Sequence, residues 1–347
     1  MGVKEKPIVK ELEQILGQLM PLKHFMVTAF ARNAFFLLIK ACGWEKPAEI
    51  IIPAFTCPVI KYTVEAANAV PIPVDAEENG LNIDPELIKK AITANTRAIY
   101  VVHTYGNPAQ IQKICSIARE HGLVVIEDLA HSLFTAWQGE QLGICGDYAI
   151  LSFTKEIIDF EGGAIATNNS EVYQKMLALR EEYQQKKKFS LGWLIDSYVR
   201  LIGSWWESGF SRSALCFMRF NDWINEVIYK GSYGIRIDHS QFHASAMGSR
   251  LALLQLRGLQ QKKSKPGPDW YEACYLSGEG SPPATPYNIK LIPEPDVFIR
   301  RHSFRTWHNP YEIGFYPRAD SLFQQLRIFS RMKTYSRESD QVVPETQ

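Results

Sequence analysis

Short apolar runs alternate with helical patterns along the first half of the chain. The apolar runs carry few charges, are rich in β-branched residues and are bounded by turn residues, a pattern that predicts buried strands. Strands joined by helices in this way predict an α/β domain built on a mostly parallel sheet. The expected strands are Ile50–Phe55, a strand in VPIPVD, Arg97–His103, Leu123–Ile126, Tyr148–Phe153 and Ala164–Thr167.

Helices are predicted where apolar residues recur every three or four positions. One helix start is marked clearly: Asp84 is followed by Pro85, and an aspartate N-cap accepts a backbone N–H while proline fits the first turn. The other helices are expected over residues 8–20, Ala34–Ala41, Gln110–His121 and Glu171–Lys188.

The same patterns divide the chain into four parts. Residues 1–188 are predicted to form a large domain around the sheet, and residues 241–335 a small C-terminal domain. Between them, residues 189–240 form an aromatic-rich helical insertion, and residues 336–347 are expected to be a disordered tail. We favour an insertion packed on the body; a lid, a partner surface or a membrane-surface contact is the alternative.

Composition narrows the class of protein. The 347 residues carry a net charge of +1, so nothing indicates a nucleic-acid partner. The N-terminus is too charged for a signal peptide and no uncharged stretch reaches a spanning length, so a cytoplasmic protein is expected. The cysteines lack a CxxC pair, which favours reduced thiols over a zinc site or a disulfide framework. They are Cys42, Cys57, Cys115, Cys145, Cys216 and Cys274.

Polar side chains gather at the ends of three expected strands. Asp128 and His131 follow the first, Ser152 and Lys155 close the second, and Glu161–Gly163 lead into the third. Ligands of open α/β sheets bind where strands end and loops begin, so these residues predict a site. A lysine and a carboxylate suit pyridoxal phosphate, which needs an amine for its Schiff base and an acid beside its ring nitrogen. Solvated loop charges are the alternative interpretation.

The local sequences VIEDLAHS, SFTK, EGGAIAT and HTYGNPAQ resemble the sugar aminotransferases of the DegT/DnrJ/EryC1/StrS family. The interval from Lys155 to Glu161 matches that family, and the resemblance covers roughly residues 25–185. It implies an aspartate-aminotransferase-like fold, pyridoxal-phosphate fold type I. Such a fold has a mostly parallel sheet with helices on both faces and a smaller α+β C-terminal domain.

This chain departs from the family at three places near the cofactor. The Ser-Gly-Thr turn that cradles the phosphate corresponds to Phe30–Asn33, and the Gly before Glu161 is Phe160. The helix that starts near Phe30–Asn33 still offers backbone N–H groups to the phosphate. Arg32 either adds a phosphate contact or is a surface arginine. An aromatic that stacks on the cofactor ring is replaced by Cys57, so Phe55 or a residue from elsewhere supplies that face, or stacking is weak.

The resemblance implies a role for each site residue. Lys155 forms the Schiff base and carries the proton, Asp128 pairs with the pyridinium nitrogen, and His131 lies beside the ring hydroxyl. Ser152 donates to the phosphate. The phosphate is also expected to meet N–H groups around Ala31, Arg32 and Asn33. Metal ligands are not expected.

The resemblance further implies an aminotransferase that moves an amino group, from glutamate, to a keto-sugar nucleotide in polysaccharide or deoxyaminosugar biosynthesis. A homodimer is implied as well, because family sites are completed across a two-fold interface. Lys155 argues against the dehydratase branch, in which that position is a histidine. Two alternatives stay open: a non-catalytic scaffold or regulatory protein that keeps the fold, and a pyridoxal enzyme that acts on a non-sugar ketone. The sequence leaves open which sugar and which carbon are aminated.

Overall fold

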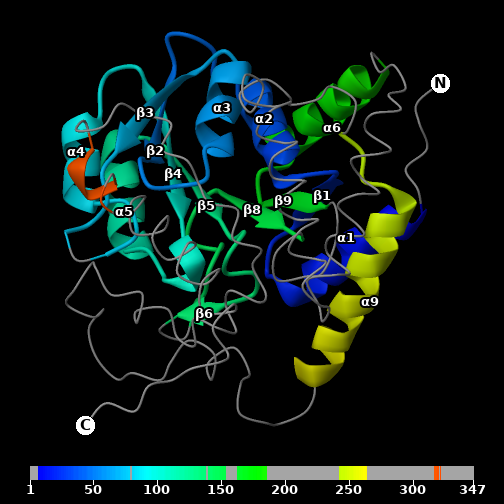
Figure 1. The fold of residues 1–347 in the computed structure, drawn as a ribbon. Helices are drawn as coiled ribbons and strands as arrows, with labels where there is room; N and C mark the ends of the chain where they lie inside the picture. The colour runs from blue at the N-terminus through cyan, green and yellow to red at the C-terminus, as the bar shows by residue number, and fades with distance from the viewer. Residues whose placement is uncertain are drawn as a thin grey trace, which may run out of the picture.

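The computed structural model describes residues 7–78, 80–137, 140–153, 162–185, 242–263, 316–319 and 321. Lys155, the insertion over 189–240, most of the C-terminal part and the tail therefore lie outside the described residues. Within the described part, seven strands form one sheet in the order β1-β9-β8-β5-β4-β2-β3 (Figure 1). They are β1 (His24–Thr28), β2 (Glu49–Pro53), β3 (Val70–Val74), β4 (Thr96–Val102), β5 (Val124–Asp128), β8 (Tyr148–Ser152) and β9 (Gly163–Thr167).

The sheet is mostly parallel, as predicted. Strands β3, β2, β4, β5 and β8 pair in parallel, whereas β9 runs antiparallel to both of its neighbours, β8 and β1. Because β9 is reversed, its first residue lies at the same edge of the sheet as the last residue of β8. A short hairpin, β6 (Ala136–Trp137) with β7 (Glu140–Gln141), lies beyond that edge.

Helices cover both faces of this sheet, which confirms the predicted α/β class. Alternate residues of each strand enter different cores: Ile50 and Ile52 of β2 pack in one cluster, and Ile51 packs in another. The first face carries α2, α3 and α6; the second carries α4 and α5 under one half of the sheet and α1 and α9 under the other. The helices are α1 (Pro7–Leu19), α2 (Ala31–Ala41), α3 (Val59–Ala66), α4 (Pro85–Ala91), α5 (Ile111–His121), α6 (Ser170–Gln185) and α9 (Ala246–Lys263).

Several element boundaries differ from the sequence prediction. Strand β1 and helix α3 were not predicted, because apolar residues run without a turn residue from Phe25 into α2 and because α3 is only 8 residues long. Helix α2 begins at Ala31 rather than Ala34, since the N–H of Asn33 already donates to the Phe30 carbonyl at 3.0 Å. Strand β2 ends at Pro53, so Phe55 belongs to the following loop.

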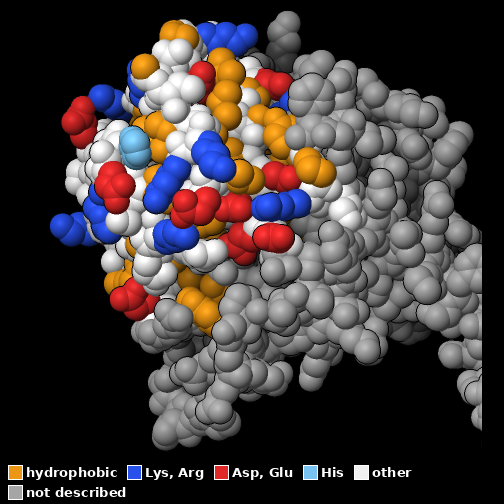
Figure 2. All heavy atoms as spheres, turned by 90° about the vertical axis from the view of Figure 1, so that its left-hand side faces the viewer, with side chains coloured by type: hydrophobic (Ala, Val, Ile, Leu, Met, Phe, Trp, Pro, Cys, Tyr) orange, Lys and Arg blue, Asp and Glu red, His pale blue; other side chains and the backbone are white. Residues whose placement is uncertain are grey.

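The start of α4 is confirmed in detail. Asp84 is the N-cap, and its carboxylate accepts the Glu86 N–H at 2.8 Å. Figure 2 shows the face that α4 and α5 cover, where Lys and Arg side chains are interleaved with Asp and Glu. Lys113 lies 3.0 Å from Glu86, an exposed pair of the kind that contributes little to stability. This face therefore presents charges of both signs.

Two glycines bring the start of β9 against the start of α2. Gly162 has φ +123° and donates its N–H to the Ala29 carbonyl at 2.6 Å. A Cβ on Gly163 would lie 2.2 Å from the Ala31 nitrogen and 2.6 Å from its Cα. Because both are backbone atoms, neither can move aside alone. The absence of a side chain at Gly163 therefore sets the distance between β9 and α2.

Gly163→Ala is expected to destabilise the fold, because the added methyl group displaces the first turn of α2. The expected loss in free energy of unfolding is about 1–3 kcal/mol or more, measured by urea denaturation. Gly258→Ala in α9 is the matched control, since nothing lies within 4 Å of the place that its added methyl group would occupy. It should stabilise slightly, as alanine favours helix over glycine. Equal denaturation midpoints for the two variants would contradict the packing argument.

Candidate functional site

Neighbouring residues on β5 face opposite sides of the sheet. Ile126 packs in the core beneath α2, whereas Val125 packs in the core beneath α5. Since side chains alternate along a strand, Asp128 lies on the α2 side and Glu127 on the α5 side. The same alternation on β8 puts Ser152 on the α2 side, two residues beyond Ile150. Two of the predicted site residues therefore share one face at the carboxyl end of the sheet.

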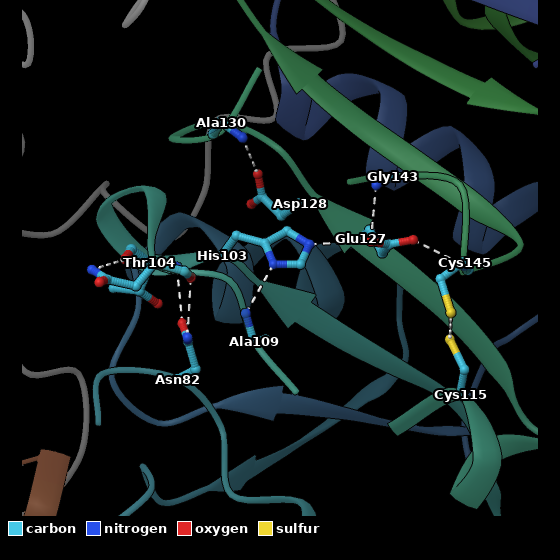
Figure 3. A network of polar contacts seen from close by, with 12 residues as sticks. Asn82, His103, Thr104, Ala109, Cys115, Glu127, Asp128, Ala130, Gly143 and Cys145 are labelled. Carbon is cyan, nitrogen blue, oxygen red and sulfur yellow. Dashed lines mark hydrogen bonds and ion pairs between the residues drawn. The ribbon is translucent and has the colours of Figure 1, made fainter. Parts of the chain in front are cut away.

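The Asp128 carboxylate is held from two directions. The Tyr100 hydroxyl donates to one oxygen at 2.8 Å. The Ala130 N–H donates to the other at 2.8 Å, a contact that Figure 3 shows. Asp128 is only 6% exposed, so these bonds fix a carboxylate in a largely dry setting. A carboxylate fixed in this way can hold a proton on a ligand nitrogen at the sheet edge.

Tyr100 is a site residue that the sequence interpretation missed. It is buried on β4, where burial and then the negative charge of Asp128 raise its pKa well above that of a free phenol. The hydroxyl therefore remains a donor through the neutral pH range. Its ring packs against Phe35 of α2, with centroids 4.5 Å apart. The only available signal was a phenol within the apolar run RAIYVV, two residues before the end of its strand.

The first turn of α2 is the second part of the site. Its N-cap, Phe30, has no side-chain oxygen and makes no capping hydrogen bond. Uncapped N–H groups at a helix start, with the positive end of the helix dipole, favour an anion. The Arg32 guanidinium lies 4.1 Å from the centre of the Phe30 ring. Ala31 touches Gly163, which pairs with Ser152, so this turn and the end of β8 are neighbours.

Several buried polar atoms near the carboxyl edge have no hydrogen-bond partner within the described ranges. Asn33 in the first turn of α2 is 1% exposed, and its Oδ1 is one of these atoms. The hydroxyls of Thr56, after β2, and Ser132, after β5, are others. Buried polar groups are normally paired, so unpaired ones at a strand edge fit a site for a polar ligand.

The remaining predicted residues lie at different places. His131 is 4% exposed in the turn after β5, and Phe55 is 2% exposed in the loop after β2. Cys57 follows Phe55 and lies near enough to Tyr100 to affect its ionisation. Lys155 lies outside the described residues, as do Phe160 and Glu161. The structure thus brings Asp128, Ser152 and the α2 turn to one edge and does not describe the lysine.

A second polar layer lies on the opposite face of the sheet (Figure 3). His103 and Glu127 are both fully buried, and the His103 Nε2 lies 3.1 Å from the Glu127 carboxylate. The Ala109 N–H donates to the His103 Nδ1 at 3.1 Å, so Nδ1 is an acceptor and Nε2 carries the proton. The His103 Nε2–H therefore donates a hydrogen bond to the Glu127 carboxylate.

Glu127 is also the anchor of the loop before β8. Its two oxygens accept the N–H groups of Gly146 at 2.7 Å and Gly143 at 2.9 Å. Burial alone would raise the pKa of Glu127, but the bonds from His103, Gly146 and Gly143 outweigh it and lower the pKa below its usual value. This carboxylate is a structural support one residue away from Asp128.

A comparison with protein-family models shows which family the chain belongs to. Residues 3–193 match the model of the DegT/DnrJ/EryC1/StrS aminotransferase family. The chain belongs to that family. The family resemblance expected from the sequence is thereby confirmed.

Individual relatives match half of the chain. The spore coat polysaccharide biosynthesis protein SpsC of Bacillus subtilis (strain 168) is 33% identical over 175 residues, 50% of this chain and 45% of its own. The GDP-perosamine synthase of Vibrio cholerae is 30% identical over 176 residues, 50% of this chain and 48% of its own. The chain thus spans about half the length of the curated relatives it matches.

A solved structure supports the fold. The aminotransferase from Psychrobacter cryohalolentis matches with a TM-score of 0.52 at 22% identity, over 74% of this chain and 57% of that one.

Two further findings concern the described residues alone. Their helices include none with the length and apolar character needed to cross a bilayer. Their His, Cys, Asp and Glu side chains form no group of three or more suited to a metal ion.

Tyr100→Phe should weaken the fold, because it removes a hydrogen-bond donor from the buried Asp128 carboxylate. We expect a loss of about 1–3 kcal/mol in the free energy of unfolding, measured by urea denaturation at neutral pH. Tyr62→Phe, on a half-buried ring of α3, is the control and should change stability less. A Tyr100→Phe protein as stable as the wild type would show that the hydroxyl does not support Asp128.

Glu127→Gln should change how stability depends on pH. A carboxyl whose pKa is lowered on folding stabilises the protein above its unfolded pKa of about 4.5, and this contribution is lost as pH falls through the folded value. The wild type should therefore lose stability on acidification below about pH 4.5, while the variant starts lower and has a flatter profile. Thermal midpoints between pH 3 and pH 7 measure this. Glu120→Gln, at an exposed carboxylate of α5, should leave the profile nearly unchanged.

Proposed function

We propose that this protein is a pyridoxal-phosphate-dependent aminotransferase that moves an amino group, from glutamate, to a keto-sugar nucleotide. The observation that carries the proposal is the fixed Asp128 carboxylate at the carboxyl end of β5. It shares a face of the sheet with Ser152 and with the uncapped start of α2. Family membership supports the same chemistry.

The described residues fit the cofactor at both of its polar ends. Asp128 would hold the proton on the ring nitrogen, since its carboxylate is buried and kept in place by Tyr100 and Ala130. The phosphate would bind at the start of α2, where backbone N–H groups have no side-chain cap and the first turn carries the buried Asn33. Its side-chain N–H₂ group and the Ser152 hydroxyl can both donate to an anion.

The departures from the family pattern at this turn have a physical counterpart. A Ser-Gly-Thr turn offers hydroxyl donors, whereas Phe30–Asn33 offers backbone N–H groups, an amide and a guanidinium. Arg32 already stacks on Phe30, which holds its charge near the helix start. We propose that Asn33 and Arg32 replace the missing hydroxyls as phosphate donors.

Pyridoxal phosphate, when bound, supplies an electron sink through which an amino group can leave an amino acid and enter a carbonyl compound. The protein's own part is to position groups and move protons. Asp128 keeps the ring nitrogen protonated, and Tyr100 keeps the Asp128 carboxylate oriented. His131 is proposed to pack beside the ring hydroxyl. Lys155 is proposed to hold the cofactor and to accept and return the proton of the substrate carbon.

The substrate class rests on the relatives. One is named as a GDP-perosamine synthase and another as a protein of spore coat polysaccharide biosynthesis. Both names point to sugar biosynthesis, which supports a sugar nucleotide as acceptor. We further propose a homodimer, because the family resemblance implies a site completed across a two-fold interface. A cytoplasmic location is proposed as well. A non-catalytic relative with the same fold is the competing proposal and is an outcome of the test below.

The test is the visible absorbance of the purified protein mixed with pyridoxal phosphate, before and after glutamate is added. We expect a visible band from the bound cofactor that glutamate bleaches, because the amino group of glutamate passes to the cofactor and gives its pyridoxamine form. Lys155→Ala should lack the band. Lys175→Ala is the matched control; it removes an exposed lysine of α6 and should keep both the band and the response.

The other outcomes separate the alternatives. A Lys155-dependent band that glutamate leaves unchanged would support pyridoxal phosphate as the cofactor and would exclude glutamate as the amino donor. A band that Lys155→Ala and Lys175→Ala both retain would reflect surface lysines. Absence of any specific band in the wild type would overturn the enzyme and support a non-catalytic role.

A further inference from the structure

Two cysteine sulfurs meet on the α5 side of the sheet. Cys115 lies on the inner face of α5 and Cys145 in the loop before β8, 30 positions apart, yet their Sγ atoms are 2.8 Å apart (Figure 3). A disulfide bond is about 2.05 Å long, so a small approach of the two sulfurs would join them. Both thiols are free in this structure.

The two thiols differ in access to solvent. Cys145 is half-buried, so a small reagent can reach it, whereas Cys115 is 4% exposed and packs in the core beneath α5. The pKa of Cys145 is lowered because the Cys115 thiol can donate a hydrogen bond to its thiolate. Cys145 is therefore the attacking sulfur and Cys115 the sulfur that follows.

Another half-buried cysteine provides a contrast. Cys42, at the end of α2, has a pKa raised to about 11 by burial, which outweighs its hydrogen bond with Tyr148. A thiol that stays protonated is a poor nucleophile. Position and ionisation thus single out the pair of Cys115 and Cys145 from Cys42.

The loop that carries Cys145 also holds the support of the candidate site. Gly143 and Gly146, on either side of Cys145, donate to Glu127, which binds His103 and is followed by Asp128. A cross-link at Cys145 would attach this loop to α5. The segment that it closes, from 115 to 145, includes β5 and Asp128.

We propose that Cys115 and Cys145 form a reversible disulfide, an oxidation site distinct from the proposed cofactor site. The oxidant is a low-molecular-weight disulfide. The Cys145 thiolate attacks one of its sulfurs, the S–S bond breaks, and one thiol leaves with a proton. Cys115, losing its proton, then attacks the Cys145 sulfur of the mixed disulfide and releases the second thiol. Two protein thiols are oxidised and one disulfide is reduced to two thiols.

The experiment uses the folded full chain and oxidised glutathione. After incubation, free thiols are alkylated, and the protein is digested without reductant and analysed by mass spectrometry. We expect a linked pair of peptides containing Cys115 and Cys145, two hydrogen atoms lighter than the separate peptides, which a dithiol converts back. Glutathione held stably on Cys145 of the wild type would overturn the proposal, because Cys115 would then fail to resolve it.

Three variants sharpen the result. Cys115→Ser should accumulate glutathione on Cys145, and Cys145→Ser should leave Cys115 unmodified. Cys42→Ser is the control and should form the same linked peptides as the wild type. The proposal fails if glutathione modifies other cysteines of the folded wild type while this pair stays reduced, or if the link forms only after urea unfolding. None of these readouts depends on the cofactor, so failure here leaves the proposed function standing.

Discussion

The hydrogen bond between His103 and Glu127 is the constraint on which the candidate site depends. It joins the end of β4 to the end of β5 inside a dry core, where an unpaired carboxylate would be costly. Glu127 satisfies its lone pairs with three donors, two of them from the loop that leads into β8. One buried carboxylate therefore fixes the ends of β4 and β5 and the loop before β8 relative to one another. Asp128 is the next residue of β5, so its backbone position is fixed as well, although its side chain lies on the opposite face.

A second constraint acts across the sheet edge. Gly163 lets the start of β9 approach the start of α2 more closely than any side chain would allow. The distance between Ser152 and the helix N-terminus is consequently set by backbone contact. The position of Asp128 is thus fixed by a polar network. The position of the α2 N-terminus is fixed by close backbone packing against Gly163.

Strand–helix alternation was enough to predict the sheet, and the motif spacing was enough to predict the family. The antiparallel insertion of β9 and the edge strand β1 could not be predicted, since a buried apolar run carries no mark of its direction or its neighbours. Asp128 was found because its position at the end of an apolar run is visible in the sequence. Tyr100 was missed because its significance lies in a contact 28 positions away, and the thiol contact was missed because no spacing encodes it.

The hydrogen bond from the Phe153 N–H to the Gly162 carbonyl, 3.0 Å long, has a consequence for the segment between them. It holds Phe153 and Gly162 next to each other, and Ser152 pairs with Gly163 beside them. The entropy of joining two chain ends that are held together changes slowly with the number of residues between them. The number of residues between Phe153 and Gly162 can therefore change without moving Ser152 or Gly163. A family that keeps these two anchor points is free to vary the spacing between its serine and its lysine.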